Sequence, residues 1–345
     1  MMNGTDASAA LATPEQIIDD LWAPRATQVL VTAIELDLFG CIAAGQHSVS
    51  GIATAAGADP RGVRHVLDAL VALGYLDKTG AASSQPRYVL TQVSARFLVP
   101  GTDSYLGDMA RETRLLWSSW ARLTDVVRTG EPTAAWEQES VGREQFPQLV
   151  SAWFPMSFGA ARAAVAALPP TTRESARRLL DVAAGSGAWS LAFALALPEL
   201  RVTTVDYSEV CAITRSYAER FGVADRYDHV TGNLREVDFG TGYDIVVLGY
   251  IVHTEGPEWG RKLIERAYAA LRPGGTLVIG DMVPNDERTD PIVPLVFGAT
   301  DLLLYSTEGQ VFTEREFREW LTGAGFTAVE TLDILAPSPL IVATR

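Results

Sequence analysis

The chain has 345 residues, with 28 Lys or Arg against 42 Asp or Glu and a net charge of −14. Such an acidic surface repels phosphate backbones and anionic lipid, so neither nucleic acid nor a membrane is expected as a partner. The length leaves room for two domains or more. Cys41 and Cys211 lie in apolar helical contexts, which predicts free thiols rather than a disulfide.

The N-terminal residues 1–16 lack the basic and apolar regions of a signal peptide. No apolar stretch reaches the roughly 18 residues that a membrane helix needs. We therefore expect a soluble cytoplasmic protein.

Residues 1–100 are predicted to form a winged-helix domain. Apolar residues have helical spacing over 13–40, and the stretch VSGIATAAGADPRGVRHVLDALVALGYL (49–76) predicts two helices joined at Gly57. Two short strands then flank a Gly/Ser-rich loop. This domain has six Lys or Arg against nine Asp or Glu. That charge favours a dimerisation domain, with a DNA-binding domain as the alternative.

Residues 101–175 form a predicted helical linker that is rich in aromatic side chains. Aromatic residues at helical spacing are often core, but a flat aromatic substrate also needs such walls. We expect some of these side chains to line a substrate pocket: Trp117, Trp120, Trp153, Phe154, Met156 and Phe158.

Strands and helices alternate over residues 176–345, which predicts an α/β doubly wound sheet. The expected strands are 178–182, 201–206, 227–231, 243–249 and 276–281, with a weaker pair at 328–333 and 340–343. The expected helices are 188–197, 208–221, 258–271 and 314–323. A capping box of Thr313 and Glu316 predicts the start of the last helix.

The stretch LLDVAAGSGAWSLAFALA (179–196) predicts a strand, a glycine turn and a helix, the pattern of a nucleotide site. Asp206, at the end of the next strand, can accept hydrogen bonds from both ribose hydroxyls, as NAD and S-adenosylmethionine sites both require. Asp181 precedes the glycines and would oppose a pyrophosphate but attract a cationic ligand. The apolar strand in YDIVVLGYIVH (243–253) and the helix, turn and strand in ALRPGGTLVIGD (270–281) also favour S-adenosylmethionine.

These features together resemble class I S-adenosylmethionine-dependent methyltransferases. The winged-helix start, the aromatic linker and FTEREFREWLTGAGF (312–326) resemble, more narrowly, small-molecule O-methyltransferases with an N-terminal dimerisation domain. The resemblance implies a homodimer, S-adenosyl-L-methionine as cofactor, no metal, and an aromatic or polyketide-like acceptor of secondary metabolism.

The family pattern also implies roles for individual residues. His253 would deprotonate the acceptor hydroxyl, and Asp281 would hold its imidazole; a neutral imidazole can accept this proton at neutral pH. Phe297 and Asp301 would join the aromatic side chains of the linker in the substrate pocket. The implied cofactor-binding residues are Asp181, Ala183, Gly185, Gly187, Asp206, Tyr207, Asn233, Leu234, Gly249 and Tyr250.

Two departures from the family pattern leave alternatives open. Where the family commonly has His-Asp-Trp-x-Asp, this chain has HTEGPEW, and the second acid that often brackets the histidine falls on Val311. Glu255 and Glu258 are expected to be solvated charges. A C- or N-methyltransferase and a non-methylating enzyme that uses bound S-adenosylmethionine therefore remain as alternatives. The winged-helix pattern keeps a DNA-binding regulator as a further alternative.

Overall fold

A computed structural model describes residues 13–80, 86–102, 104–334, 336 and 338–345. The chain divides into two compact units, Met1–Thr113 and Arg114–Arg345. The helix α6 (Asp108–Trp120) crosses this division.

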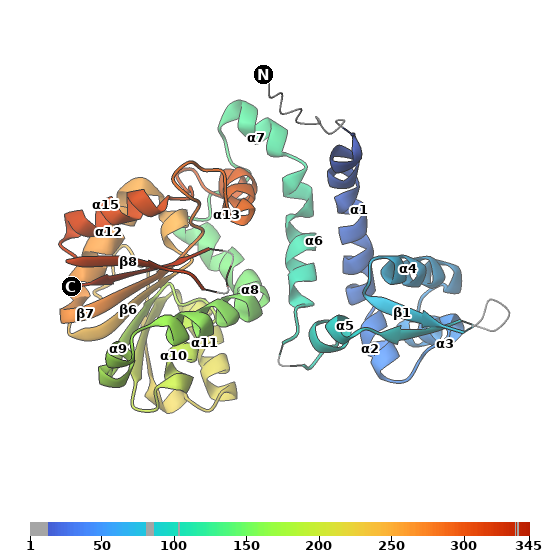
Figure 1. Ribbon diagram of the computed structural model, residues 1–345, viewed down its shortest axis with the longest axis horizontal. Coiled ribbons are helices and arrows are strands. Elements are labelled where there is room, and N and C mark those ends of the chain that lie inside the picture. The colour runs from blue at the N-terminus through green and yellow to red at the C-terminus, as the bar shows by residue number, and fades with distance from the viewer. Residues whose placement is uncertain (1–12, 81–85, 103, 335, 337) are drawn as a thin grey trace, which may run out of the picture. The chain divides into compact units, whose positions relative to one another are not determined.

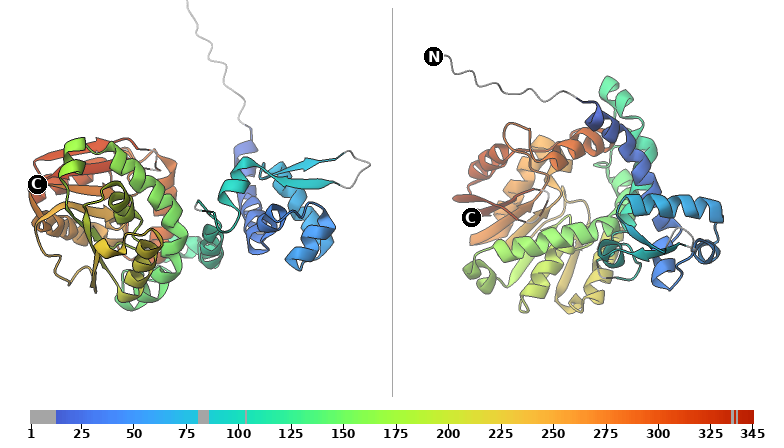
Figure 2. Two further views of the ribbon diagram at one scale, coloured as in Figure 1. Left: turned by 90° about the horizontal axis from the view of Figure 1, so that it is seen from below. Right: turned by 45° about the vertical axis from the view of Figure 1, so that its right-hand side comes forward.

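The N-terminal unit has the predicted helix-turn-helix and two-stranded wing. Gly57 ends the first helix of the motif in the left-handed conformation, and Asp59 caps the second by accepting a 3.0 Å hydrogen bond from Gly62 N. Figure 2 shows the hairpin beside the helices of its own unit; its predicted loop, 81–85, lies outside the described residues. The elements are α1 (Glu15–Glu35), α2 (Leu38–Ala43), α3 (Val49–Ala56), α4 (Pro60–Ala72), β1 (Leu76–Thr79), β2 (Arg87–Leu90) and α5 (Gln92–Phe97).

The C-terminal unit begins with helices and continues as alternating strands and helices. The helices α7 (Leu123–Thr129), α8 (Glu139–Ala167) and α9 (Pro170–Ser175) precede the sheet. The strands are β3 (Arg178–Val182), β4 (Arg201–Asp206), β5 (Tyr227–Thr231), β6 (Tyr243–Gly249), β7 (Leu271–Gly280), β8 (Ala328–Leu332) and β9 (Leu340–Thr344). The later helices are α10 (Ala188–Ala196), α11 (Ser208–Arg220), α12 (Val252–Ala270), α13 (Ile292–Phe297), α14 (Leu303–Tyr305) and α15 (Glu314–Ala324).

The described residues of this unit form a seven-stranded sheet in the order β5-β4-β3-β6-β7-β9-β8. The strands from β5 to β7 are parallel, and β9 runs antiparallel to both β7 and β8. The predicted doubly wound class is confirmed. The chain places β4 and β5 on one side of β3 and then returns to place β6 and β7 on the other side. The carboxyl ends of β3 and β6 therefore form the switch point at which such folds bind ligands.

Helices cover both faces of the sheet, as Figure 1 shows. Apolar residues of α8, α10 and α11 pack on one face, and those of α12 and α15 pack on the other. The capping box at the start of α15 is present, with Thr313 and Glu316 each accepting the other's backbone N–H, and Gly325 ends the helix.

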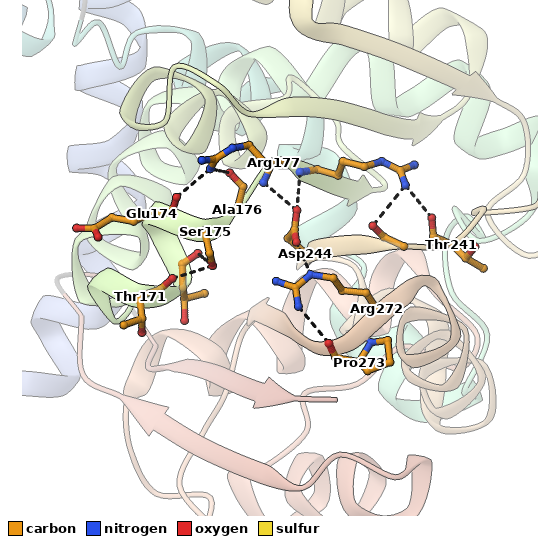
Figure 3. A network of polar contacts seen from close by, with 12 residues as sticks. Thr171, Glu174, Ser175, Ala176, Arg177, Thr241, Asp244, Arg272 and Pro273 are labelled. Carbon is orange, nitrogen blue, oxygen red and sulfur yellow. Dashed lines mark hydrogen bonds and ion pairs between the residues drawn. The ribbon is translucent and has the colours of Figure 1, made fainter.

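The Pro-Gly-Gly turn predicted before β7 is instead a bulge inside this strand. Leu271 already pairs with Tyr243, and the next pair is Thr276 with Ile245, so four residues of β7 lie opposite Asp244 alone. Figure 3 shows how Asp244 links the start of β3 to the bulge in β7. Its Oδ2 accepts the backbone N–H of Arg177 and Arg178 at 2.8 and 2.9 Å, and its Oδ1 pairs with Arg272.

Both cysteines are free thiols, as predicted; Cys211 is buried and Cys41 is half-buried. Within the described ranges, no helix is long and apolar enough to cross a membrane.

Candidate active site

The glycine loop after β3 bends sharply over the sheet edge. Ala183, Gly185 and Gly187 all have positive φ, of 57°, 58° and 75°. A side chain at Gly187 would lie 2.7 Å from Cγ2 of Thr214, while the hydroxyl of Thr214 donates a 2.7 Å hydrogen bond to the Gly185 carbonyl. The predicted glycine pattern therefore shapes a loop whose backbone can approach a ligand closely.

Two carboxylates lie beside this loop. Oδ2 of Asp206 accepts the Gly185 N–H at 2.9 Å and Oδ1 accepts the Tyr207 N–H at 2.8 Å. Asp181 is 1 % exposed and accepts the Ser190 N–H at 3.1 Å. Burial raises the pKa of Asp181 to about 7 and that of Asp206 to about 6, because ionisation inside the protein is costly.

Neither carboxylate forms an ion pair within the part of the chain that the structure describes. A buried carboxylate is normally paired or bound to a cation, so buried Asp181, with half-buried Asp206 beside the same loop, forms an environment that favours a positively charged ligand. A sulfonium or ammonium group fits this environment and a pyrophosphate does not.

The predicted adenine-side residues follow β4 and β5. Asn233 accepts the Arg235 N–H at 3.0 Å and donates to Glu139 at the start of α8 at 3.2 Å, so its amide is already held in place. Leu234 is half-buried. Burial raises the pKa of Tyr207 to about 12, with the nearby acid Glu139 as the next cause.

A buried histidine and a buried aspartate follow β6 and β7. They lie at the same carboxyl ends of the parallel strands as the glycine loop after β3. The Nδ1 atom of His253 hydrogen-bonds to Oδ1 of Asp281, and the His253 backbone N–H donates to Oδ2 at 3.2 Å. His253 is 6 % and Asp281 2 % exposed. Since the carboxylate holds Nδ1, the arrangement can orient the imidazole with Nε2 as the proton-accepting atom.

His253 lies in the first turn of α12, before the helix that the sequence predicts over 258–271. This helix begins at Val252 and is interrupted at Gly256, whose backbone is non-helical (φ 73°, ψ 178°) before Pro257. The expected helix over 258–271 is the part that follows this kink. The backbone of His253 is therefore held by a helical turn, which is more rigid than a loop.

The expectation that Glu255 is solvated is wrong. Its side chain is buried, and Oε2 lies 2.7 Å from Nε of Arg235, from the segment after β5. Burial raises the pKa of Glu255, and the ion pair opposes that rise. Glu258 is solvated as expected, with a side chain 74 % exposed beside Lys262.

Tyr250 directly follows β6, in the connection to the turn that contains His253. Its φ is 57°, unusual for a residue with a side chain, and its N–H donates a 2.7 Å hydrogen bond to the Gly280 carbonyl. Burial raises its pKa to about 12. Gly249 and Gly280 are cross-strand partners, and a Cβ on either would overlap the buried ring of Trp189, which meets Tyr250 edge-on at 5.9 Å.

The predicted pocket residues separate into two groups. Phe297 packs edge-on against His253, with ring centroids 5.1 Å apart, and Asp301 follows four residues later. Trp120 packs beside Leu304 and Tyr305 in the same region, 6.1 Å from Trp117. These residues stay candidates for the pocket.

Phe154 belongs to the apolar core, and half-buried Phe158 packs against it. Phe154 stacks on Phe158 at 5.1 Å and on Tyr217 of α11 at 4.2 Å, in the apolar layer that covers one face of the sheet. For Phe154 the core alternative holds, because this face of α8 packs against α10 and α11. Phe158 stays a candidate for the pocket. Trp153 and Met156 of α8 are half-buried.

Val311 occupies an apolar cluster with Met282 and Leu302, against which Tyr250 and Phe297 pack. The second acid of the family pattern is therefore replaced by packing. Among the described residues, no three His, Cys, Asp or Glu side chains lie close enough to hold a metal ion.

Comparison with known proteins identifies the family. Residues 120–327 match the family model of the O-methyltransferase domain, and residues 22–100 match that of the O-methyltransferase dimerisation domain. The chain belongs to the O-methyltransferase family. This confirms the resemblance drawn from the sequence, and the dimerisation-domain match supports the predicted homodimer.

The tetracenomycin polyketide synthesis 8-O-methyl transferase TcmO of Streptomyces glaucescens is 30% identical over 342 residues, covering 96% of this chain and 97% of that protein. The 3-hydroxy-5-methyl-1-naphthoate 3-O-methyltransferase of Streptomyces sahachiroi is 30% identical, covering 90% of this O-methyltransferase and 89% of the relative. Human N-acetylserotonin methyltransferase, solved in complex with S-adenosylmethionine, has the same fold: TM-score 0.85, 21% identity, 100% of this chain and 99% of that one.

Proposed function

We propose that this enzyme transfers a methyl group from S-adenosylmethionine to a hydroxyl oxygen of an aromatic or polyketide-like small molecule. The observation that carries the proposal is the buried His253–Asp281 pair, at the same sheet edge as the unpaired carboxylates of Asp181 and Asp206. The names of the naphthoate and tetracenomycin enzymes support the class of acceptor.

The cofactor-binding side would use the residues around the glycine loop. Asp206 would accept the ribose hydroxyls, Asp181 and the loop backbone would hold the amino acid part, and Asn233 and Leu234 would border the adenine. Bound S-adenosylmethionine supplies a positively charged, electrophilic methyl group. The carboxylates of Asp181 and Asp206 would provide the negative charge that such a cation needs.

The acceptor side would use His253 as general base. With Nδ1 held by Asp281, Nε2 would take the proton of the acceptor hydroxyl as its oxygen attacks the methyl carbon. The Asp281 carboxylate would then stabilise the imidazolium. Tyr250 would help align the acceptor oxygen with the methyl group. Alignment of the reactants supplies most of the rate acceleration in such a transfer.

The enzyme would act as a homodimer in the cytoplasm, with no nucleic-acid or membrane partner. The dimerisation-domain match and the net charge of −14 support this. Light scattering should give twice 37.2 kDa, and addition of duplex DNA should leave that value unchanged.

The proposed function is tested by the products. The protein is incubated with S-adenosylmethionine and a panel of phenolic acceptors, each matched with its methyl ether. S-adenosylhomocysteine should form with the phenols and not with the ethers, and nuclear magnetic resonance should place the new methyl on oxygen. A new methyl on carbon or nitrogen, or turnover without S-adenosylhomocysteine, would favour the alternatives of the same fold.

A further inference from the structure

The first residue of α8 brings a carboxylate to the segment after β5. Oε2 of Glu139 accepts a 3.2 Å hydrogen bond from Nδ2 of Asn233, although 94 positions separate the two residues in the chain. Burial raises the pKa of Tyr207, and the negative charges of Glu139 and Asp206 add to the rise, so both carboxylates lie near this residue. Glu139 is therefore close to the residues that we propose for the ribose and for the adenine.

An arginine holds the Glu139 carboxylate in place. Nη1 of Arg143, one helical turn further along α8, donates a 3.2 Å hydrogen bond to Oε1 of Glu139. The same guanidinium is fixed to the start of α11, where Nη2 donates to Glu209 at 2.9 Å and to Ser208 at 3.1 Å. The Glu139 side chain is 44 % exposed, and each of its oxygens can accept a further hydrogen bond. The carboxylate is thus both oriented and accessible.

Asn233 offers a donor beside this acceptor. Its Oδ1 accepts the Arg235 N–H at 3.0 Å, and because a backbone N–H can only donate, this contact identifies the oxygen of the amide. One Nδ2 hydrogen is directed to Glu139, and the other has no acceptor among the described residues. A free N–H of Asn233 and a carboxylate oxygen of Glu139 therefore lie side by side.

We propose that Glu139 recognises the amino group of the adenine in S-adenosylmethionine, an inference that rests on the proposed function. An adenine edge presents its amino group as a donor next to a ring nitrogen that accepts. The amino group would donate to Glu139, a charge-assisted hydrogen bond, and the ring nitrogen would accept from Asn233. Hypoxanthine has a carbonyl oxygen in place of the amino group and would bring an acceptor against the carboxylate. Glu139 is therefore assigned as a residue that determines specificity for the adenine base.

The test compares two ligands that differ only at this amino group, S-adenosylhomocysteine and S-inosylhomocysteine. Calorimetry measures both dissociation constants, so the test requires no methyl transfer. The wild type should bind the adenine compound about 10- to 100-fold more tightly, the range for a hydrogen bond to a charged group. Glu139→Gln should reduce this ratio to about threefold or less, because a carboxamide can turn to present either its oxygen or its amino group.

A matched variant separates recognition of the base from a general effect of charge. Glu144→Gln removes the same charge from an exposed position of α8 and should leave the ratio of dissociation constants unchanged. A wild type that binds both compounds equally, or a Glu139→Gln variant that keeps the wild-type ratio, would overturn the proposal and leave the proposed function intact. Failure of the wild type to bind either compound would overturn both.

Discussion

Oε2 of Glu255 lies 2.7 Å from Nε of Arg235, so an ion pair joins the first turn of α12 to the segment after β5. The Glu255 side chain is 7 % and that of Arg235 25 % exposed. This pair fixes the turn that contains His253, only two residues before Glu255, to the segment that contains Asn233 and Leu234. The ion pair thereby fixes the position of the acceptor side of the proposed site relative to its cofactor side.

Breaking this pair should destabilise the protein. Glu255→Ala leaves the Arg235 guanidinium largely buried without its partner. Loss of one partner of a fully buried pair costs about 3–5 kcal/mol, and the partial exposure of Arg235 reduces our expectation to about 1–3 kcal/mol. Urea unfolding measures the change. Glu258→Ala, three residues further on and exposed, is the matched control and should have little effect; equal effects would contradict a special role for Glu255.

The glycines at the ends of β6 and β7 should be intolerant of a methyl group. Gly280→Ala places its Cβ against the buried ring of Trp189, and overpacking of this kind costs about 1–3 kcal/mol. Trp189→Leu should relieve the overlap, so the double variant should be more stable than the sum of the single effects predicts. Thermal unfolding of the four proteins gives the coupling. Strict additivity would show that the Trp189 ring is not what excludes the side chain.

Binding of S-adenosylmethionine should strengthen as the pH rises from 5.5 to 7. Burial raises the pKa of Asp181 to about 7 and that of Asp206 to about 6, so the free protein holds protons that a cationic ligand must displace. Affinity should therefore rise about tenfold across this range. Calorimetry at both pH values provides the measurement. Asp206→Asn should weaken binding by about 1.5–3 kcal/mol and reduce the pH dependence, whereas Asp228→Asn should do neither.

In the protein without ligand, the same carboxylates lower the free energy of unfolding as the pH rises. Their pKa values are higher in the folded than in the unfolded state, so the folded state binds more protons between about pH 4 and pH 7. Their contribution to the free energy of unfolding is greatest below that window and is lost as the pH rises through it. The stabilisation by S-adenosylmethionine, measured as a shift in Tm, should accordingly be larger at pH 7 than at pH 5.5. An equal shift at both pH values would show that the ionisation of Asp181 and Asp206 is not coupled to S-adenosylmethionine binding.

Much of the fold and part of the site followed from local patterns. The glycine loop and Asp206 were predictable because parallel strands place their carboxyl ends along one end of the sheet. The His253–Asp281 pair was implied by the family resemblance. The burial of Glu255 was not, since it depends on Arg235, 20 residues earlier. Helical spacing alone also did not tell that Phe154 faces α11 rather than a pocket. The bulge in β7 depends on its pairing with β6, which residues 271–280 alone do not reveal.

The central claim is that His253 removes the proton of the acceptor hydroxyl. It is tested most directly by a single-turnover measurement of methyl transfer in His253→Ala, with S-adenosylmethionine affinity measured on the same sample. The rate should fall by roughly 10²–10⁴ and the affinity should stay within about twofold, because the imidazole acts on the acceptor and not on the donor. A variant that keeps most of the wild-type rate, or one that loses rate only through weaker donor binding, would contradict the claim.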